Sequence, residues 1–272
     1  MIYAGRVSDM DLEHFKFGMA FSVMRMSAAN ICDYLNFPEF DALELPWETL
    51  IAPDDEKAQF LNREIVRRGK KVLCGGTMVL QLASEIAFAP EKLRKSFAAE
   101  LEKSLLLLAD LGFQDVTLEC PLERIAGNTD AEKAFREIVL RVAPVLLQRN
   151  MTMLVPAKFP CGNVAEIMKL LRDTMIPNIK LRLDVYPWAL PEKAGLRETA
   201  GLLGFETRAV VFRYDADCGN RILKQHITQW IDYLNRTGSR ALLLLSPHSQ
   251  RNRMAFPEAT QFSGIIGELR NS

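Results

Sequence analysis

The chain has 272 residues, and its 34 Lys and Arg balance its 34 Asp and Glu, so the formal net charge is zero. We therefore expect no nucleic acid and no membrane as partner, because a neutral chain offers either of them no electrostatic attraction. Hydrophobic residues make up 49% and charged residues 25% of the chain, which excludes a disordered or fibrous protein. Five scattered cysteines without a CxxC pair, and an acidic N-terminus unlike a signal peptide, predict a reducing, cytoplasmic location.

Short apolar runs typical of strands alternate with helical stretches along the whole chain. The predicted strands are Lys16–Phe21, Asp41–Leu45, Lys71–Cys74, Asp115–Cys120, Met151–Val155, Ile179–Val185, Ala209–Tyr214 and Ala241–Leu245. The predicted helices are Ser27–Asn36, Asp54–Arg68, Pro90–Leu111, Thr129–Gln148, Val164–Thr174, Glu192–Leu203, Arg221–Asn235 and Pro257–Arg270. This alternation predicts an α/β fold of the (β/α)8 TIM-barrel type, one domain over residues 1–272 with residues 1–15 before its first strand. A doubly wound open sheet is the alternative, but no glycine-rich phosphate loop follows any strand.

The strands predict a charged interior, because alternate residues of a barrel strand point away from the helices. In the sixth strand Lys180, Arg182, Asp184 and Tyr186 share one side. Two interpretations remain open for the interior charges. They form a salt-bridge network of Arg182 and Lys180 with Asp115 and Glu119, or they line a ligand pocket.

Strand ends are the better candidates for function, because the active sites of TIM barrels lie at the carboxyl ends of their strands. The predicted catalytic residues are Glu44, Glu119, Lys158 and Asp184. The predicted substrate-binding residues are Trp47, Tyr186, Trp188, Arg213 and His248. We also expect Lys158 to form an ion pair with Glu119 on the adjacent strand.

Four segments carry a resemblance to a known family. FDALEL at Phe40–Leu45, LADLGFQDVT at Leu108–Thr117, LRLD at Leu181–Asp184 and VVFRYD at Val210–Asp215 occur in the expected order. They resemble the second strand, the passage into the fourth strand, and the sixth and seventh strands of xylose-isomerase-like TIM barrels. That family includes sugar isomerases, ketose 3-epimerases, inosose dehydratases and apurinic-site endonucleases.

The resemblance implies a divalent metal, held by a glutamate, an aspartate, a histidine and a glutamate on the fifth to eighth strands. Only the aspartate is matched, by Asp184, whereas the other positions fall at Pro156, Phe212 and Ser246. His248 is the histidine that could reach the site. We therefore expect a degenerate metal site, empty or weakly occupied, where Lys158 and Arg213 hold water or an anion.

Two functions follow from the resemblance and the strand ends. The first is a sugar or sugar-phosphate isomerase or epimerase, in which carboxylates move a proton while Lys158 or Arg213 polarises the substrate oxygen. A variant of it uses Lys158 as a Schiff-base amine. The second is a non-catalytic barrel that binds a carbohydrate, a metabolite or a protein partner. Residues 1–15 could cover the barrel or join a second copy, so a homo-oligomer fits either function.

Overall fold

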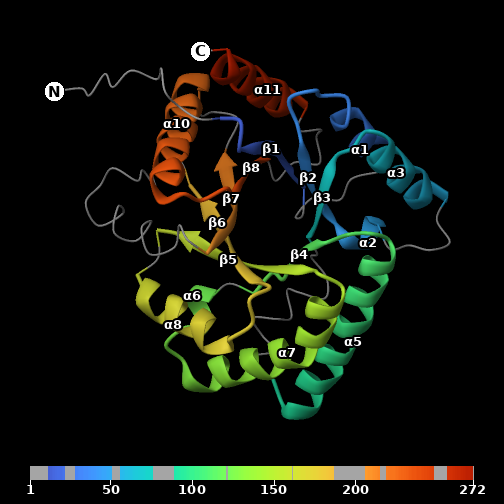
Figure 1. The fold of residues 1–272 in the computed structure, drawn as a ribbon, viewed down its shortest axis with the longest axis vertical. Helices are drawn as coiled ribbons and strands as arrows, with labels where there is room; N and C mark the ends of the chain where they lie inside the picture. Colours follow the sequence, from blue (N-terminus) through green and yellow to red (C-terminus); the bar gives the residue numbers. More distant parts are fainter. Residues whose placement is uncertain are drawn as a thin grey trace.

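The strands form a closed parallel barrel in the order of the sequence (Figure 1). The computed structural model describes residues 12–21, 28–50, 56–75, 89–120, 122–160, 162–186, 206–214, 219–247 and 256–271. The strands are β1 (Lys16–Ala20), β2 (Ala42–Pro46), β3 (Lys71–Gly75), β4 (Asp115–Thr117), β5 (Thr152–Phe159), β6 (Ile179–Val185), β7 (Thr207–Tyr214) and β8 (Leu242–Pro247). The closed barrel confirms the predicted TIM-barrel fold and excludes the open sheet.

Helices surround the barrel, with α5 and α7 side by side on one flank and α10 and α11 on another (Figure 1). The described helices are α1 (Ala28–Tyr34), α2 (Trp47–Leu50), α3 (Glu56–Arg67), α5 (Glu91–Asp110), α6 (Leu122–Ile125), α7 (Thr129–Gln148), α8 (Val164–Thr174), α10 (Asn220–Thr237) and α11 (Phe256–Arg270). The predicted helix Glu192–Leu203 lies outside the described residues.

Several element boundaries agree with the sequence and others do not. The ranges of β6, α7 and α8 match the predicted ones residue for residue. The fifth strand is longer than predicted, because the ladder continues through Pro156, which pairs in register with Arg182. The fourth strand is shorter and ends at Thr117, so Glu119 follows the strand instead of lying within it.

The barrel interior is lined by a cluster of small and branched apolar side chains. They are Ala20, Ala42, Leu73, Leu154, Ala209, Val211, Leu242 and Leu244. The opposite faces of the strands pack against the helices; in β6 Ile179, Leu181 and Leu183 belong to this outer core. The predicted two-sided pattern of β6 is therefore confirmed, and it turns Arg182 and Asp184 into the barrel.

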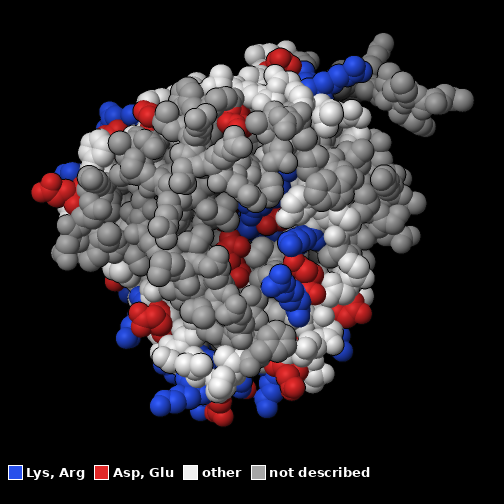
Figure 2. All heavy atoms as spheres, turned by 180° about the vertical axis from the view of Figure 1, so that it is seen from behind, with Lys and Arg blue, Asp and Glu red and all other residues white. Residues whose placement is uncertain are grey.

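The described surface carries no strong charge of one sign on the face seen in Figure 2. Basic and acidic side chains are interspersed there, and both kinds gather in a hollow near its centre. Within the described part of the chain, no helix is long and apolar enough to cross a membrane.

Candidate functional site

The guanidinium of Arg182 lies at the centre of three carboxylates inside the barrel. Its side chain is 0% exposed. Arg182 Nη1 lies 2.6 Å from Glu44 Oε1 and 2.9 Å from Glu119 Oε1, and Arg182 Nε lies 3.1 Å from Asp184 Oδ1. We call these four residues the Arg182 cage.

Three strands supply the cage, because each turns its residue inward. Glu44 is the third residue of β2, Glu119 follows the end of β4, and Asp184 lies two residues after Arg182 on β6. The Thr117 hydroxyl donates a hydrogen bond of 2.8 Å to Glu44 Oε1. The other oxygen, Glu44 Oε2, is buried and has no hydrogen-bond partner among the described residues. Burying a carboxylate oxygen without a partner costs free energy, so Glu44 depends strongly on Arg182.

A second guanidinium, that of Arg213 on β7, joins the cage to β8. Arg213 Nη2 donates to Asp184 Oδ2 at 2.9 Å, and Arg213 Nη1 donates to Ser246 Oγ at 2.6 Å. Arg182 Nη2 reaches the same Asp184 oxygen at 3.2 Å. Asp184 therefore binds two guanidinium groups through its two carboxylate oxygens.

The environment moves the pKa values of Glu119 and Asp184 in opposite directions. Burial raises the pKa of Glu119 above its ordinary value; Arg182 opposes this shift, while Glu44 and Asp184 reinforce it. Burial alone would also raise the pKa of Asp184, but Arg182 and Arg213 outweigh it and hold that pKa below its ordinary value. Divergent pKa values in neighbouring carboxyls are typical of sites where one group carries a proton and the other stays ionised.

Lys158 lies beside the cage but is not part of it. It shares its strand face with Leu154 of the barrel interior and pairs in register with Asp184, and its side chain is exposed. The predicted ion pair between Lys158 and Glu119 is wrong. Glu119 pairs instead with Arg182, whose planar fork reaches both of its oxygens, at 2.9 and 3.5 Å.

The other predicted binding residues differ in how accessible they are to a ligand. Trp47 is 1% exposed in the outer core, so its indole offers no face to a ligand. Tyr186 follows β6 and is partly exposed, and Arg213 is 11% exposed. Trp188 and His248 lie outside the described residues.

The predicted salt-bridge network is correct for some pairs and wrong for others. Arg182 binds Glu119 as that interpretation has it. Lys180 instead contacts Glu206 at 2.8 Å, and Asp115 contacts Lys71 at 2.5 Å. Lys180 and Asp115 lie near the amino ends of their strands, whereas Arg182 and Glu119 lie further toward the carboxyl ends. The two sets of charges are therefore at different heights in the barrel and do not form one network.

The positions expected for metal ligands hold other groups. Phe212 packs edge-on against His226 in the outer core, with ring centroids 5.6 Å apart. The inward positions next to it are Val211 and Arg213, so the strand-seven position that faces the barrel is not the one that we predicted. No group of three or more His, Cys, Asp or Glu side chains suited to a metal ion occurs in the part of the chain that the structure describes.

Arg182 itself was not among the predicted site residues, although it organises all the carboxylates. Alternation in LRLD turns both Arg182 and Asp184 inward, and that signal was present in the sequence. Alternation in the fourth strand also turns Thr117 inward, but no sequence signal pointed to its hydrogen bond with Glu44 or to Ser246 as an acceptor.

Comparison with known proteins identifies the fold. No protein-family model and no curated protein sequence matches the chain. Among solved structures, a 3-keto-D-glucoside 4-epimerase from E. coli matches with a TM-score of 0.65 and 12% identity, covering 95% of this chain and 100% of that one. A D-tagatose 3-epimerase-like protein matches with a TM-score of 0.63 and 12% identity, covering 94% and 98%.

A third match shows how broad the shared fold is. An AP endonuclease of family 2 from Brucella melitensis matches with a TM-score of 0.58 and 13% identity, covering 87% of this chain and 93% of that one. These structures have different activities, so the likeness concerns architecture. The chain has the fold of the xylose-isomerase-like TIM barrels, as its sequence segments indicated.

Proposed function

We propose that this protein binds a small sugar or sugar phosphate at the carboxyl end of its barrel and moves a proton on it, with Glu119 as the acid–base group. The observation that carries the proposal is the exposure of Glu119 together with its raised pKa. Glu119 is the most exposed carboxylate of the cage, with 21% of its side chain accessible, and its pKa is raised. A partly exposed carboxyl group with a raised pKa holds a proton more readily than a free one, which suits it to take up and return a proton.

Lys158 and Arg213 complete the proposed site with positive charge. Both lie on the inward faces of their strands close to Asp184, Lys158 by register and Arg213 by a hydrogen bond. In an aldose–ketose isomerisation step ionised Glu119 takes the proton from the hydroxyl-bearing carbon next to the carbonyl, and the carbonyl oxygen gains the negative charge. Lys158 stabilises that oxygen. The proton of the neighbouring hydroxyl passes to it, and Glu119 returns its own proton to the former carbonyl carbon, so that the carbonyl moves by one carbon.

We propose that this site works without a divalent metal, because its residues do not fit one. Asp184 already binds two guanidiniums, Ser246 Oγ accepts from Arg213, and Pro156 has no ligating atom. A cation at Asp184 would lie within a few Å of Arg213, where the repulsion between unit charges is about 4 kcal/mol at 4 Å and an effective dielectric of about 20.

The second candidate function, a barrel that binds without catalysis, is favoured by one observation. Two of the three carboxylates, Glu44 and Asp184, are buried and held by guanidinium groups, so neither is free to move a proton. Binding of a sugar without exchange of its protons would be the result expected of this alternative.

Proton exchange in D2O separates the two candidates. The protein is treated with EDTA, screened against ketoses, aldoses and their phosphates by thermal shift, and the stabilising compounds are followed by 1H NMR for loss of the C–H signal next to the carbonyl. We expect exchange with the unaltered protein and a loss of about 100-fold or more in Glu119→Gln. Lys158→Met should also lose most of the exchange.

The controls carry the same substitutions at an exposed ion pair. Glu100 and Lys103 lie on α5, with 62% and 75% of their side chains exposed. Glu100→Gln and Lys103→Met should therefore leave exchange unchanged. Exchange that appears only after a divalent metal is restored would contradict the metal-free proposal.

A further inference from the structure

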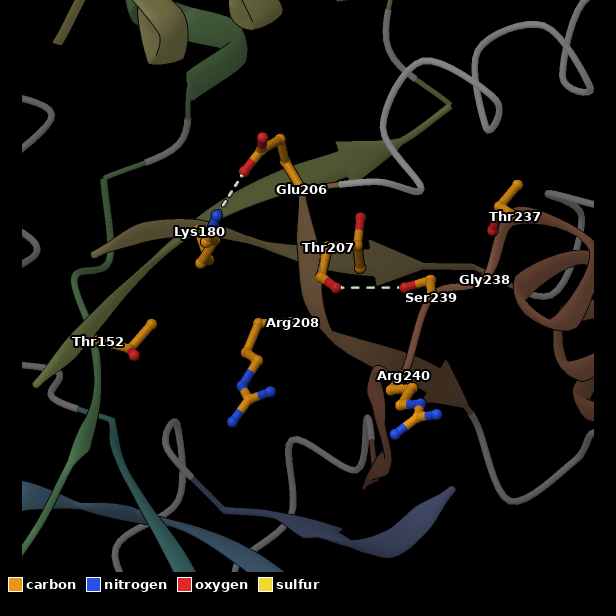
Figure 3. Close-up of a pocket in the computed structure, with 9 residues that line it drawn as sticks. All are labelled: Thr152, Lys180, Glu206, Thr207, Arg208, Thr237, Gly238, Ser239 and Arg240. Carbon is orange, nitrogen blue, oxygen red and sulfur yellow. Dashed lines mark hydrogen bonds and ion pairs between the residues drawn. The ribbon is translucent and has the colours of Figure 1, made fainter. Parts of the chain in front are cut away.

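A pocket of about 400 Å³ opens at the opposite end of the barrel from the Arg182 cage (Figure 3). Its walls come from the amino ends of β5, β6 and β7 and from the turn that joins α10 to β8. The lining residues are Thr152, Lys180, Glu206, Thr207, Arg208, Thr237, Gly238, Ser239 and Arg240. The volume falls in the range of pockets that bind small molecules, about 300–1,000 Å³.

The lining is positively charged and only partly neutralised. It contains three cationic side chains, Lys180, Arg208 and Arg240, and one carboxylate, Glu206. Lys180 Nζ pairs with Glu206 at 2.8 Å, and this pair is drawn as a dashed line in Figure 3. Within the described residues Arg240 is exposed and has no acidic partner. The two arginines therefore carry the uncompensated charge of the pocket.

Arg208 owes its position to an irregularity of the sheet. The register between β6 and β7 shifts at Leu181 and Arg182, so that Thr207 pairs with Leu181 and Ala209 with Arg182. Arg208 is the extra residue, and such bulges re-aim a side chain. Its Nε lies 3.9 Å from Asp115 Oδ1, too far for a hydrogen bond.

Asp115 neutralises Arg208 only in part, because the single carboxylate is shared with a second and closer cation. Lys71 Nζ lies 2.5 Å from Asp115 Oδ2. The Arg208 side chain remains 45% exposed at the mouth of the pocket. A bulge that places a half-exposed, weakly paired Arg208 in the same pocket as the exposed Arg240 is an arrangement suited to an anion.

We propose that this pocket binds a phosphate group, either inorganic phosphate or the phosphoryl group of a small metabolite, between Arg208 and Arg240. The planar guanidinium matches phosphate oxygens in pairs, and two such groups hold a dianion more strongly than a monoanion. Glu206 and the carbonyl end of α10 repel an anion at the other wall. The phosphate therefore lies on the arginine side of the pocket. The wall formed by Glu206 and the end of α10 suits the hydroxyl groups of an attached metabolite.

Calorimetric titration tests the proposal with inorganic phosphate and with glycerol 3-phosphate, at one fixed ionic strength because exposed charges are screened by salt. We expect saturable binding of one ligand per chain. Arg208→Gln and Arg240→Gln should each weaken it by about tenfold or more, since each removes a charge-assisted contact. The exposed Arg141, paired with Glu102 on the outer helices, supplies the control, and Arg141→Gln should leave binding unchanged.

The two ligands identify the source of the phosphate. Tighter binding of glycerol 3-phosphate indicates a phosphorylated metabolite, and equal or tighter binding of inorganic phosphate indicates the free ion. The absence of saturable binding of either ligand at concentrations up to about 10 mM would overturn the proposal. So would binding that survives in both arginine variants.

The pocket and the Arg182 cage are tested independently. Phosphate binding that is lost in Lys158→Met but retained in Arg208→Gln would place the ligand at the carboxyl end and contradict this inference. Sugar proton exchange should be unaffected by Arg208→Gln and Arg240→Gln, so failure at one end leaves the other end intact.

Discussion

Arg182 and Glu44 are separated by 138 residues of sequence, and their side chains meet at 2.6 Å inside the barrel, each 0% exposed. A buried ion pair of this kind adds little net stability, because removing both charges from water offsets most of their attraction. Removal of one partner is different, because the other charge stays buried without compensation. The Arg182 cage should therefore be sensitive to single substitutions.

Arg182→Met tests that sensitivity. The substitution leaves three carboxylates near one another without their shared cation, and we expect the free energy of unfolding to fall by about 3–5 kcal/mol. Urea denaturation at neutral pH measures it. The matched control is Arg141→Met, which breaks an exposed pair with Glu102 and should cost less than about 1 kcal/mol. Equal free energies of unfolding for Arg182→Met and Arg141→Met would contradict the expectation that Arg182 compensates buried charges.

Glu119→Gln should change how stability depends on pH. The pKa of Glu119 is raised in the folded protein above its ordinary value of 4.5. The protonated form therefore favours folding, and that stability is fully present below pH 4.5 and is lost as the pH rises through the raised pKa. The glutamine variant lacks this loss. Its free energy of unfolding should rise relative to that of the unaltered protein as the pH increases above 4.5, in denaturant titrations at a series of pH values.

Asp184→Asn should show the opposite dependence. The pKa of Asp184 lies below its ordinary value of 3.8, because Arg182 and Arg213 outweigh the effect of burial. Its ionised form contributes stability that is present above pH 3.8 and lost as the pH falls through the lowered pKa. The unaltered protein should therefore exceed the variant in stability at neutral pH, and the difference should shrink in acid below pH 3.8. A difference that grows in acid would contradict the assignment.

The sequence predicted the elements better than the contacts. The α7 boundaries were readable because Asn128 caps the helix, its Oδ1 accepting from Ala131 N at 3.1 Å, and capping depends on neighbours in the chain. The inward side of β6 was readable from alternation. The Arg182 cage was only partly readable, because it joins β2, β4 and β6, and which carboxylate a long side chain reaches depends on the assembled barrel.

The remaining differences have local causes. The sequence motif placed the strand-seven position at Phe212, whereas the barrel turns that ring outward and Arg213 inward. The bulged residues 207–209 contain no glycine that would mark an irregularity, so alternation alone could not predict the Arg208 side chain at the pocket.

Gly18→Ala should disrupt the barrel where β1 meets β2. A Cβ atom at Gly18 would lie 1.7 Å from the carbonyl oxygen of Ala42, which belongs to the strand backbone and cannot move aside cheaply. We expect the free energy of unfolding to fall by well above the roughly 1 kcal/mol that is usual for a point substitution, toward the 4–5 kcal/mol that marks severe ones. Gly264→Ala is the control, since nothing lies within 4 Å of its added Cβ on α11. That helix should gain up to about 1 kcal/mol.

Divalent metal should stabilise this protein very little. Asp184 shares its oxygens with Arg182 and Arg213, and Ser246 accepts from Arg213, so a cation would have to displace a guanidinium to gain one carboxylate. If the dissociation constant is about 1 mM or weaker, 1 mM Mn²⁺, Zn²⁺ or Mg²⁺ adds at most about 0.4 kcal/mol to the free energy of unfolding. Thermal unfolding with each metal against EDTA measures this shift.

Arg213→Leu separates two causes of weak metal binding, which are competition from the Arg213 guanidinium and the small number of ligands. It removes the competing guanidinium and leaves Asp184 and Ser246 in place. Because one carboxylate and one hydroxyl are still too few ligands for a tight site, we expect metal affinity to stay weak in this variant. Metal bound at one equivalent per chain in the unaltered protein, measured by elemental analysis after purification without added metal, would contradict this expectation if it is lost in Asp184→Asn.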